Sequence, residues 1–267
     1  MGKIEYTNLK VPYLDNEERR IGIYLPGDYE TSDKDYPVLY IHDGQNVFND
    51  SESYSGVSWN VGGTLEDFEN RGYEGIIAVA IDNSEHRPLE YSPLGIFNER
   101  LGLRASDEEV LGDKYLDFLV NDVKSYVEEN YRTKKGRKNA YMIGSSAGAN
   151  ITLYASIVKK LDFSIYGIFS PATYIFEGRF EELWDEYSAR NHEFYFYVGT
   201  EEGYGLDNYK EVSRKYLDCT LNNLKSVLDN GVRGKDIDIQ IGYQSIHTEK
   251  AWREAFPAFV EFLYKDR

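Results

Sequence analysis

The feature that most constrains this chain is the stretch YMIGSSAGAN, residues 141–150, which has the pattern G-x-S-x-G at its centre. The pattern describes a strand that turns sharply into a helix, with the middle serine on the strained corner and its hydroxyl clear of the backbone. Gly144 and Gly148 suit such a turn, because a β-carbon there would collide with the neighbouring strand and helix. A glycine-rich turn without chemistry is the alternative. An apolar run precedes the pattern and a helical segment follows it, so we predict that Ser146 is a nucleophile.

The composition favours a single α/β domain over residues 1–267. Of the 267 residues, 41% are hydrophobic and 15% are aromatic, which is enough apolar surface for one core. No linker-like composition or internal repeat divides the chain. The formal net charge of -16 would repel polyanions, so we expect neither nucleic acid nor an anionic membrane surface as a partner.

The N-terminal residues lack the apolar core of a signal peptide, and no run approaches the length of a membrane span. We therefore expect a cytoplasmic protein, although a secreted protein whose signal peptide had been removed would have the same sequence. The single cysteine, Cys219, excludes an intrachain disulfide and fits a reducing compartment. Because it falls in a helical pattern, we expect a buried and inert thiol. The sequence makes no prediction of oligomeric state.

Strand-like and helical segments alternate along the chain. The predicted strands are apolar runs at 19–25, 37–42, 75–81, 139–143, 163–169, 194–198 and 237–241. The predicted helices lie at 62–70, 115–130, 149–158, 180–189 and 248–265, and one long helix has a face marked by Leu217, Leu221, Leu224 and Leu228. This alternation predicts a mostly parallel sheet with helices on both faces. In such a sheet the reactive groups gather at the carboxyl ends of the strands.

The segment 82–113 shows little periodicity, and long loops in compact domains are usually functional or mobile. We expect it to line or cover a site, in the manner of a lid. Polar and aromatic residues in this and other loops are the candidates for substrate contact: Asn46, Trp59, Tyr91, Phe97 and Arg100. The alternative for the aromatic ones is that they cap the core.

Candidate reactive groups follow three of the predicted strands in the order serine, acid, histidine, which is the order of α/β-hydrolases. A serine hydroxyl is protonated at neutral pH, so an imidazole must accept its proton during attack, and a carboxylate must orient that imidazole. Of the four histidines, His247 lies between the last strand and the last helix, so we predict that it is the general base for Ser146. Glu202 is the first choice for the acid, and Glu201 and Asp207 are alternatives.

A tetrahedral intermediate also needs two backbone N–H donors for its oxyanion. We expect one from Ala147, directly after the nucleophile, and the other from Gln45 in the HDGQN loop that follows the strand at 37–42. An ordinary Asp-Gly turn is the alternative for this loop. His42, beside it, is expected to have a structural hydrogen-bonding role.

Four stretches, PVLYIHDGQNVF, GSSAG, YVGTEEG and IHTEKAWREAFP, occur in this order between about Ile21 and Leu263. Together they resemble the esterase D-like family of α/β-hydrolases, which includes feruloyl, acetyl-xylan and enterochelin esterases. The resemblance implies a serine carboxylesterase that needs no cofactor and acts on a small-molecule or carbohydrate ester. It implies roles as nucleophile, base, acid and oxyanion donors for Ser146, His247, Glu202, Gln45 and Ala147. A metal site is not expected, because the histidines are scattered rather than paired at ligand spacing.

The chain departs from the family at three positions. Ala147 stands where methionine is common after the nucleophile, and it is followed by Gly148-Ala149 where Gly-Gly is common. Thr248 stands where asparagine is common after the histidine. The smaller Ala147 would widen the acyl pocket, so the substrates of relatives do not transfer directly. The predicted reaction is hydrolysis of an ester, of the acetyl or feruloyl type, through an acyl-enzyme. The open alternatives are an acyltransferase of the same fold and a non-catalytic binding module.

Overall fold

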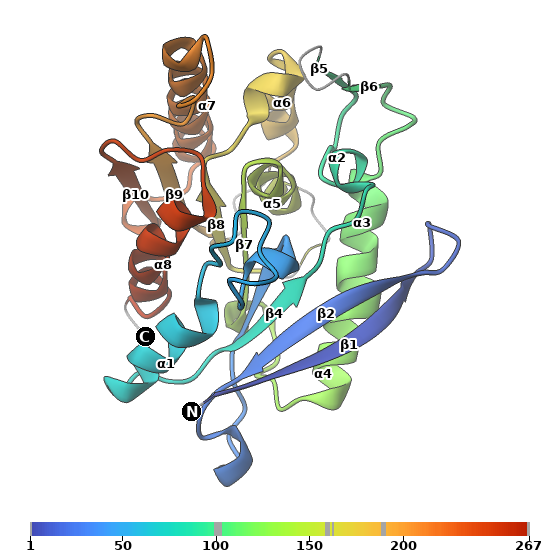
Figure 1. Cartoon of the computed structure of the whole chain (residues 1–267), viewed down its shortest axis with the longest axis vertical. Coiled ribbons are helices and arrows are strands. Elements are labelled where there is room, and N and C mark those ends of the chain that lie inside the picture. The colour runs from blue at the N-terminus through green and yellow to red at the C-terminus, as the bar shows by residue number, and fades with distance from the viewer. Residues whose placement is uncertain (1, 99–102, 158–160, 162, 188–190, 266–267) are drawn as a thin grey trace.

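Figure 1 shows the computed structural model, which describes residues 2–98, 103–157, 161, 163–187 and 191–265. Within these residues the central sheet has eight strands in the order β1-β2-β4-β3-β7-β8-β9-β10. They are β1 (Lys3–Val11), β2 (Glu17–Leu25), β3 (Val38–His42), β4 (Ile77–Ile81), β7 (Ala140–Ser145), β8 (Ile165–Phe169), β9 (Glu193–Gly199) and β10 (Ile237–Gly242). Strand β2 pairs antiparallel with β1 and β4, and the other neighbouring pairs are parallel. The predicted α/β architecture is confirmed.

Strands β3, β4, β7 and β8 are buried along their whole length, as expected of parallel strands that are covered on both faces. Because side chains alternate along a strand, each strand contributes to two cores. In β9, Phe194 and Phe196 join one core and Tyr195 joins the other. Strand β1 was not predicted, because its side chains are mostly polar and only Val11 is fully buried.

Helices cover both faces of the sheet (Figure 1). The core on one face includes side chains from α1 (Val61–Asn70) and α8 (Glu249–Leu263). The core on the other face includes side chains from α3 (Gly112–Phe118), α4 (Ser125–Asn130), α5 (Ala147–Ile157) and α7 (Tyr209–Asp229). A π-helical segment, Leu119–Lys124, joins α3 to α4, so the predicted helix at 115–130 is one continuous element. No helix within the described residues combines the length and the apolar character that crossing a bilayer requires.

The predicted apolar face of α7 was wrong for two of its four leucines, since only Leu217 and Leu224 pack against the cores. Leu221 and Leu228 are 45% and 46% exposed, while polar residues such as Asn223 are buried. The buried amide of Asn223 donates to Thr173 Oγ1 and accepts from Trp184 Nε1, at 2.9 and 3.0 Å. The helix therefore turns its hydrogen-bonding side inward, and a reading of leucine spacing alone misplaced that side by part of a turn.

The one cysteine lies on the same inward side of α7. Cys219 is 4% exposed, and its Sγ contacts the carbonyl oxygen of Pro171. Burial raises the pKa of this thiol to about 12, so the thiolate is negligible at neutral pH. The prediction of a buried cysteine is confirmed, and the raised pKa agrees with the expectation that the thiol is inert.

The predicted helix at 180–189 is shorter than expected. It consists of α6 (Arg179–Glu182) and a 3-10 turn, Leu183–Glu186, and residues 188–189 lie outside the described part of the chain. The turn allows Trp184 to reach the core beside α7, where its side chain is 2% exposed. Short helices of this kind depend on such contacts rather than on their own propensity.

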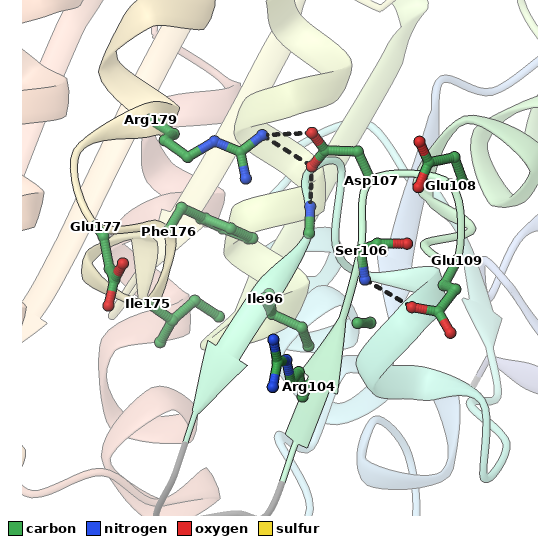
Figure 2. Close-up of a pocket in the computed structure, with 12 residues that line it drawn as sticks. Ile96, Arg104, Ser106, Asp107, Glu108, Glu109, Ile175, Phe176, Glu177 and Arg179 are labelled. Carbon is green, nitrogen blue, oxygen red and sulfur yellow. Dashed lines mark hydrogen bonds and ion pairs between the residues drawn. The ribbon is translucent and has the colours of Figure 1, made fainter.

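The segment 82–113 contains a short helix, α2 (Arg87–Glu90), and a hairpin of β5 (Ile96–Asn98) and β6 (Leu103–Ala105). A pocket of about 610 Å³ lies between this hairpin and the α6 region, and Figure 2 shows the side chains that line it. Across it, the guanidinium of Arg179 bonds both carboxylate oxygens of Asp107 at 2.8 and 2.7 Å, and Asp107 also accepts from the N–H of Gly95. Asp107, which follows β6, is thus joined to Arg179 at the start of α6 by an ion pair.

Candidate active site

Ser146 occupies the corner between β7 and α5 and has a left-handed backbone, with φ of 58°. Such a conformation is uncommon for a residue with a side chain. A β-carbon added to Gly144 would lie 2.4 Å from the carbonyl oxygen of Gly148 and 2.9 Å from His42 Cδ2. The corner therefore has no room for a side chain at Gly144, and the strand–turn–helix that the sequence predicts is present.

The substitution Gly144→Ala should lower the free energy of unfolding by about 1–3 kcal/mol, because the new methyl group overpacks a backbone carbonyl that cannot move freely. Gly234→Ala is a matched control, since nothing lies within 4 Å of a β-carbon at that position. The control should change stability by less than about 0.5 kcal/mol. Urea unfolding curves of the two variants measure this difference, and equal stabilities would contradict the steric argument.

Ser146, His247 and Glu202 form one hydrogen-bonded series. Ser146 Oγ lies 3.0 Å from His247 Nε2, and His247 Nδ1 lies 2.6 Å from Glu202 Oε2. The loops that carry the acid and the imidazole are joined through their backbones, because Thr200 N donates to Gly242 O and Glu201 N donates to Ser245 O. Side chains from three distant parts of the chain therefore meet at the carboxyl ends of β7, β9 and β10.

The carboxylate of Glu202 is 4% exposed and is held by hydrogen bonds on both oxygens. Its Oε1 accepts from Gly199 N and from Ser170 Oγ, each at 2.6 Å. Ser170 Oγ in turn accepts from Trp252 Nε1 at 3.0 Å, so its own proton is directed at Glu202. Among the described residues, neither of the alternative carboxylates, Glu201 or Asp207, has a hydrogen bond to His247.

Two aromatic rings restrain the imidazole of His247. The ring of Tyr216 lies 4.7 Å from it and that of Trp252 lies 4.9 Å from it, centroid to centroid. Burial raises the pKa of Tyr216 well above its ordinary value, so its hydroxyl remains protonated beside Ser146. Sequence reasoning missed Tyr216, because it lies on the side of α7 that the leucine spacing placed away from the core.

An open cleft of about 500 Å³ lies beside these groups. Its walls come from the loop after β3, the start of the segment 82–113 and the loop before α8. The lining residues include Gln45, Asn46, Asn83, Arg87, Ser146, His247 and Glu249. Within the described residues, histidine, cysteine and acidic side chains form no cluster that could hold a metal ion.

The loop after β3 is fixed by a partly buried ion pair, in which Asp43 is buried and Arg87 is half-buried. The carboxylate of Asp43 accepts from Arg87 Nε and Nη2 at 2.6 and 2.9 Å, and from Asn83 Nδ2 at 2.5 Å. Burial opposes ionisation of Asp43, but the guanidinium of Arg87 outweighs it and holds the pKa of the carboxyl below its ordinary value. Asn83 N also donates to Gln45 Oε1 at 3.1 Å. These bonds join the Gln45 loop to the segment 82–113, which sequence reasoning expected to line a site.

Below this loop, His42 has the structural hydrogen bond that the sequence predicts. Its Nδ1 lies 2.7 Å from Tyr115 Oη, and the residue is 3% exposed. Burial lowers the pKa of His42 from 6.5 to about 4, so the imidazole is neutral at pH 7. This neutral ring packs against Gly144, at the base of the serine corner.

The His42 pKa predicts acid sensitivity. Because its folded pKa is below the unfolded value, the unfolded state binds more protons between pH 6.5 and 4, and stability falls as the pH drops through that window. His42 should therefore contribute about 2 kcal/mol to the loss of unfolding free energy between pH 7.5 and pH 5. Urea unfolding at both pH values should show a smaller loss in His42→Gln, whereas His86→Gln, which leaves His42 in place, should keep the full loss. Equal losses in all three proteins would contradict this assignment.

The predicted substrate residues have different fates. Asn46 lines the cleft, as expected. The predictions for Trp59 and Tyr91 were wrong, because both side chains are buried. Trp59 stacks on Phe169 with a centroid distance of 5.3 Å, and the hydroxyl of Tyr91 accepts from Asp43 N at 3.1 Å. These two loop aromatics complete the core rather than the cleft.

The two remaining candidates for substrate contact are not tested. Phe97 is part of β5, but its side chain is not described, and Arg100 lies outside the described residues.

The two expected oxyanion donors lie beside the serine corner and in the loop after β3. Ala147 is the first residue of α5, so its N–H has no acceptor within the helix, and Gln45 lies in the 3-10 turn Gly44–Asn46.

The family model described as "Putative esterase" matches residues 13–263. The chain belongs to the Esterase family. This membership supports ester hydrolysis as the class of reaction. The matched range includes the serine corner, the loop that carries Glu202 and the loop that carries His247.

Individual relatives agree with this membership. "Uncharacterized protein YbbA" of Bacillus subtilis (strain 168) is 24% identical over 248 residues, which is 92% of each chain. The solved structure of the siderophore hydrolase EstA from Aspergillus nidulans has a TM-score of 0.77 at 17% identity, covering 98% of this chain and 95% of that one. An IroE-like serine hydrolase from Shewanella oneidensis has a TM-score of 0.75 at 18% identity, covering 98% of this chain and 79% of that one. At these identities the structural likeness shows the α/β-hydrolase-type fold.

Proposed function

We propose that this Esterase-family chain is a serine carboxylesterase that acts through an acyl-enzyme. The observation that carries the proposal is the series of hydrogen bonds from Ser146 through His247 to Glu202 at the wall of an open cleft. A nucleophile, a base within hydrogen-bond reach and a group that orients the base are what nucleophilic catalysis by serine requires.

In the proposed mechanism, Ser146 Oγ attacks the ester carbonyl while its proton passes to His247 Nε2. Glu202 holds the Nδ1 proton and stabilises the imidazolium. The imidazolium then protonates the departing alcohol, which leaves the acyl group on Ser146. Water attacks the acyl-enzyme with His247 again accepting a proton, and the acid is released. The backbone N–H groups of Gln45 and Ala147 are the proposed donors to the oxyanion.

The proposed substrates are esters of a carbohydrate or of an aromatic acid, of the acetyl or feruloyl type, as the sequence resemblance implies. The siderophore hydrolase among the structural neighbours adds siderophore lactones as a third class to test. A hydrolysis screen over short acyl esters, acetylated xylan, feruloylated sugars and siderophore lactones separates these classes.

A fluorophosphonate probe tests the mechanism independently of the substrate. It should add one mass label to the protein, on the peptide that contains Ser146, and prior reaction with a substrate should slow that labelling. When sugar or alcohol acceptors are added to the hydrolysis assay, the substrate should still be converted to its free acid, and no new ester of the acceptor should form. Labelling with neither hydrolysis nor transfer would favour a binding module, and new ester products would favour an acyltransferase.

A further inference from the structure

Glu249 lies in the cleft, two residues after His247 in the chain. It is the first residue of α8, whose N-cap is Thr248, and it is 9% exposed. A carboxylate is tolerated at the start of a helix because the macrodipole favours negative charge there. That tolerance explains how Glu249 can be buried without a cation, but it does not explain why the side chain lines the cleft.

The carboxylate of Glu249 is only partly satisfied. Its Oε1 accepts from Asn46 Nδ2 at 3.4 Å, and no lysine or arginine among the described residues lies within ion-pair distance of it. A carboxylate has about four acceptor positions, so most of its capacity remains open. The start of the helix tolerates the charge, but the open acceptor positions can still take a hydrogen bond from a further donor.

The position of Asn46 makes this arrangement specific. Its Oδ1 accepts from Tyr54 N at 2.9 Å and from Ser53 Oγ at 3.3 Å, so its NH₂ group is the part directed at Glu249. The cation of the cleft, Arg87, is engaged by Asp43 on two nitrogens and their charges cancel. Among the described residues that line the cleft, Glu249 therefore remains as the carboxylate without a cationic partner.

We propose that Glu249 selects the substrate of the esterase: it accepts a hydrogen bond from a hydroxyl or ammonium group near the scissile ester and disfavours esters that carry an anionic group there. This inference rests on the proposed function and adds a substrate class to it. A polyol ester and an ester with a protonated amine share the required donor. A carboxylate-bearing ester would place two like charges in a cleft where water screens them poorly.

The test uses one acyl group, the best from the hydrolysis screen, on four alcohols. These are n-propanol, glycerol, protonated N,N-dimethylethanolamine and glycolate, which supply no donor, hydroxyls, an ammonium and a carboxylate. The readout is kcat/KM for each ester divided by that for the n-propyl ester, so a general loss of activity cancels. Glu249→Gln and Glu249→Leu are compared with Glu254→Gln, an exposed acid on the same helix.

In the wild-type protein, the glycerol or ammonium ester should exceed the n-propyl ester by about tenfold to a hundredfold, and the glycolate ester should fall below it. If the natural donor is an ammonium, Glu249→Gln should remove most of that preference. If it is a hydroxyl, Gln should keep part of the preference and Leu should remove it. Both variants should raise the relative rate of the glycolate ester by about tenfold, and Glu254→Gln should match the wild type.

Unchanged ratios in both Glu249 variants, with the n-propyl ester still hydrolysed, would overturn the selection by Glu249 and leave the esterase intact. A failure of the wild-type protein to hydrolyse any ester would contradict the esterase itself, and the selection with it. The two failures are therefore distinct. Thermal unfolding of each variant shows whether an altered kcat/KM ratio results from misfolding of the cleft.

Discussion

Ser146→Ala should reduce kcat/KM for a p-nitrophenyl acyl ester by about ten-thousand-fold or more. Oγ is the only heavy atom removed, so the left-handed corner, the imidazole and the cleft should persist. The residual rate would come from water attacking an ester that is still bound and polarised by the oxyanion donors. Steady-state kinetics measures the loss, and mass spectrometry after fluorophosphonate treatment should show no label on this variant.

A matched control for this substitution is Ser226→Ala, on α7 and outside the lining of the cleft. It should keep near wild-type turnover and the full fluorophosphonate label. Turnover by Ser146→Ala within tenfold of the wild type, at equal thermal stability, would refute Ser146 as the nucleophile.

Glu202→Gln should reduce kcat by roughly a thousand-fold to ten-thousand-fold. The reason lies in its donors. Gly199 N and Ser170 Oγ both donate to Oε1, so the carbonyl oxygen of a glutamine would remain there and its NH₂ group would face His247 Nδ1. The imidazole would then carry its proton on Nε2, the nitrogen that must accept the proton of Ser146. The variant would therefore lack the negative charge that stabilises the imidazolium, and it would hold the imidazole of His247 in the wrong tautomer.

Glu201→Gln is the matched control, because it changes the neighbouring carboxylate in the same loop. It should alter kcat by less than about threefold. Asp207→Asn, at an exposed position, should do the same. Kinetics and thermal unfolding of the three variants distinguish the acid from its neighbours. A loss in Glu201→Gln or Asp207→Asn as large as that in Glu202→Gln would assign the role elsewhere.

The parts of the site that the sequence predicts are those where backbone geometry restricts the residue type. Gly144 and Ser146 could be recognised because the corner excludes a β-carbon at one position and holds a left-handed backbone at the other. The strands could be recognised because parallel strands covered on both faces are continuously apolar. His247 stood out because histidines are few and it follows the last strand.

The parts that the sequence does not predict depend on partners distant along the chain. Arg87 lines the cleft and pairs with Asp43, and Tyr216 reaches His247 from a helix whose buried side is partly polar. Trp59 looks like a loop aromatic in the sequence, yet Phe169 and Trp252 enclose it. In the sequence, Glu249 is only an acid at the start of a helix. Its contact with Asn46 at the cleft joins residues that lie far apart in the chain.

Strand β10 is the last strand of the sheet, whereas β7 lies in its interior. The loops after β9 and β10 are tied to each other by backbone bonds, so the acid and the base are held by one pair of loops, whereas the serine follows β7. If β9 and β10 loosen from the rest of the sheet, the general base and its orienting carboxylate move away from the nucleophile together. Turnover would then be lost before the fold collapses, and it would return when these two strands pack again.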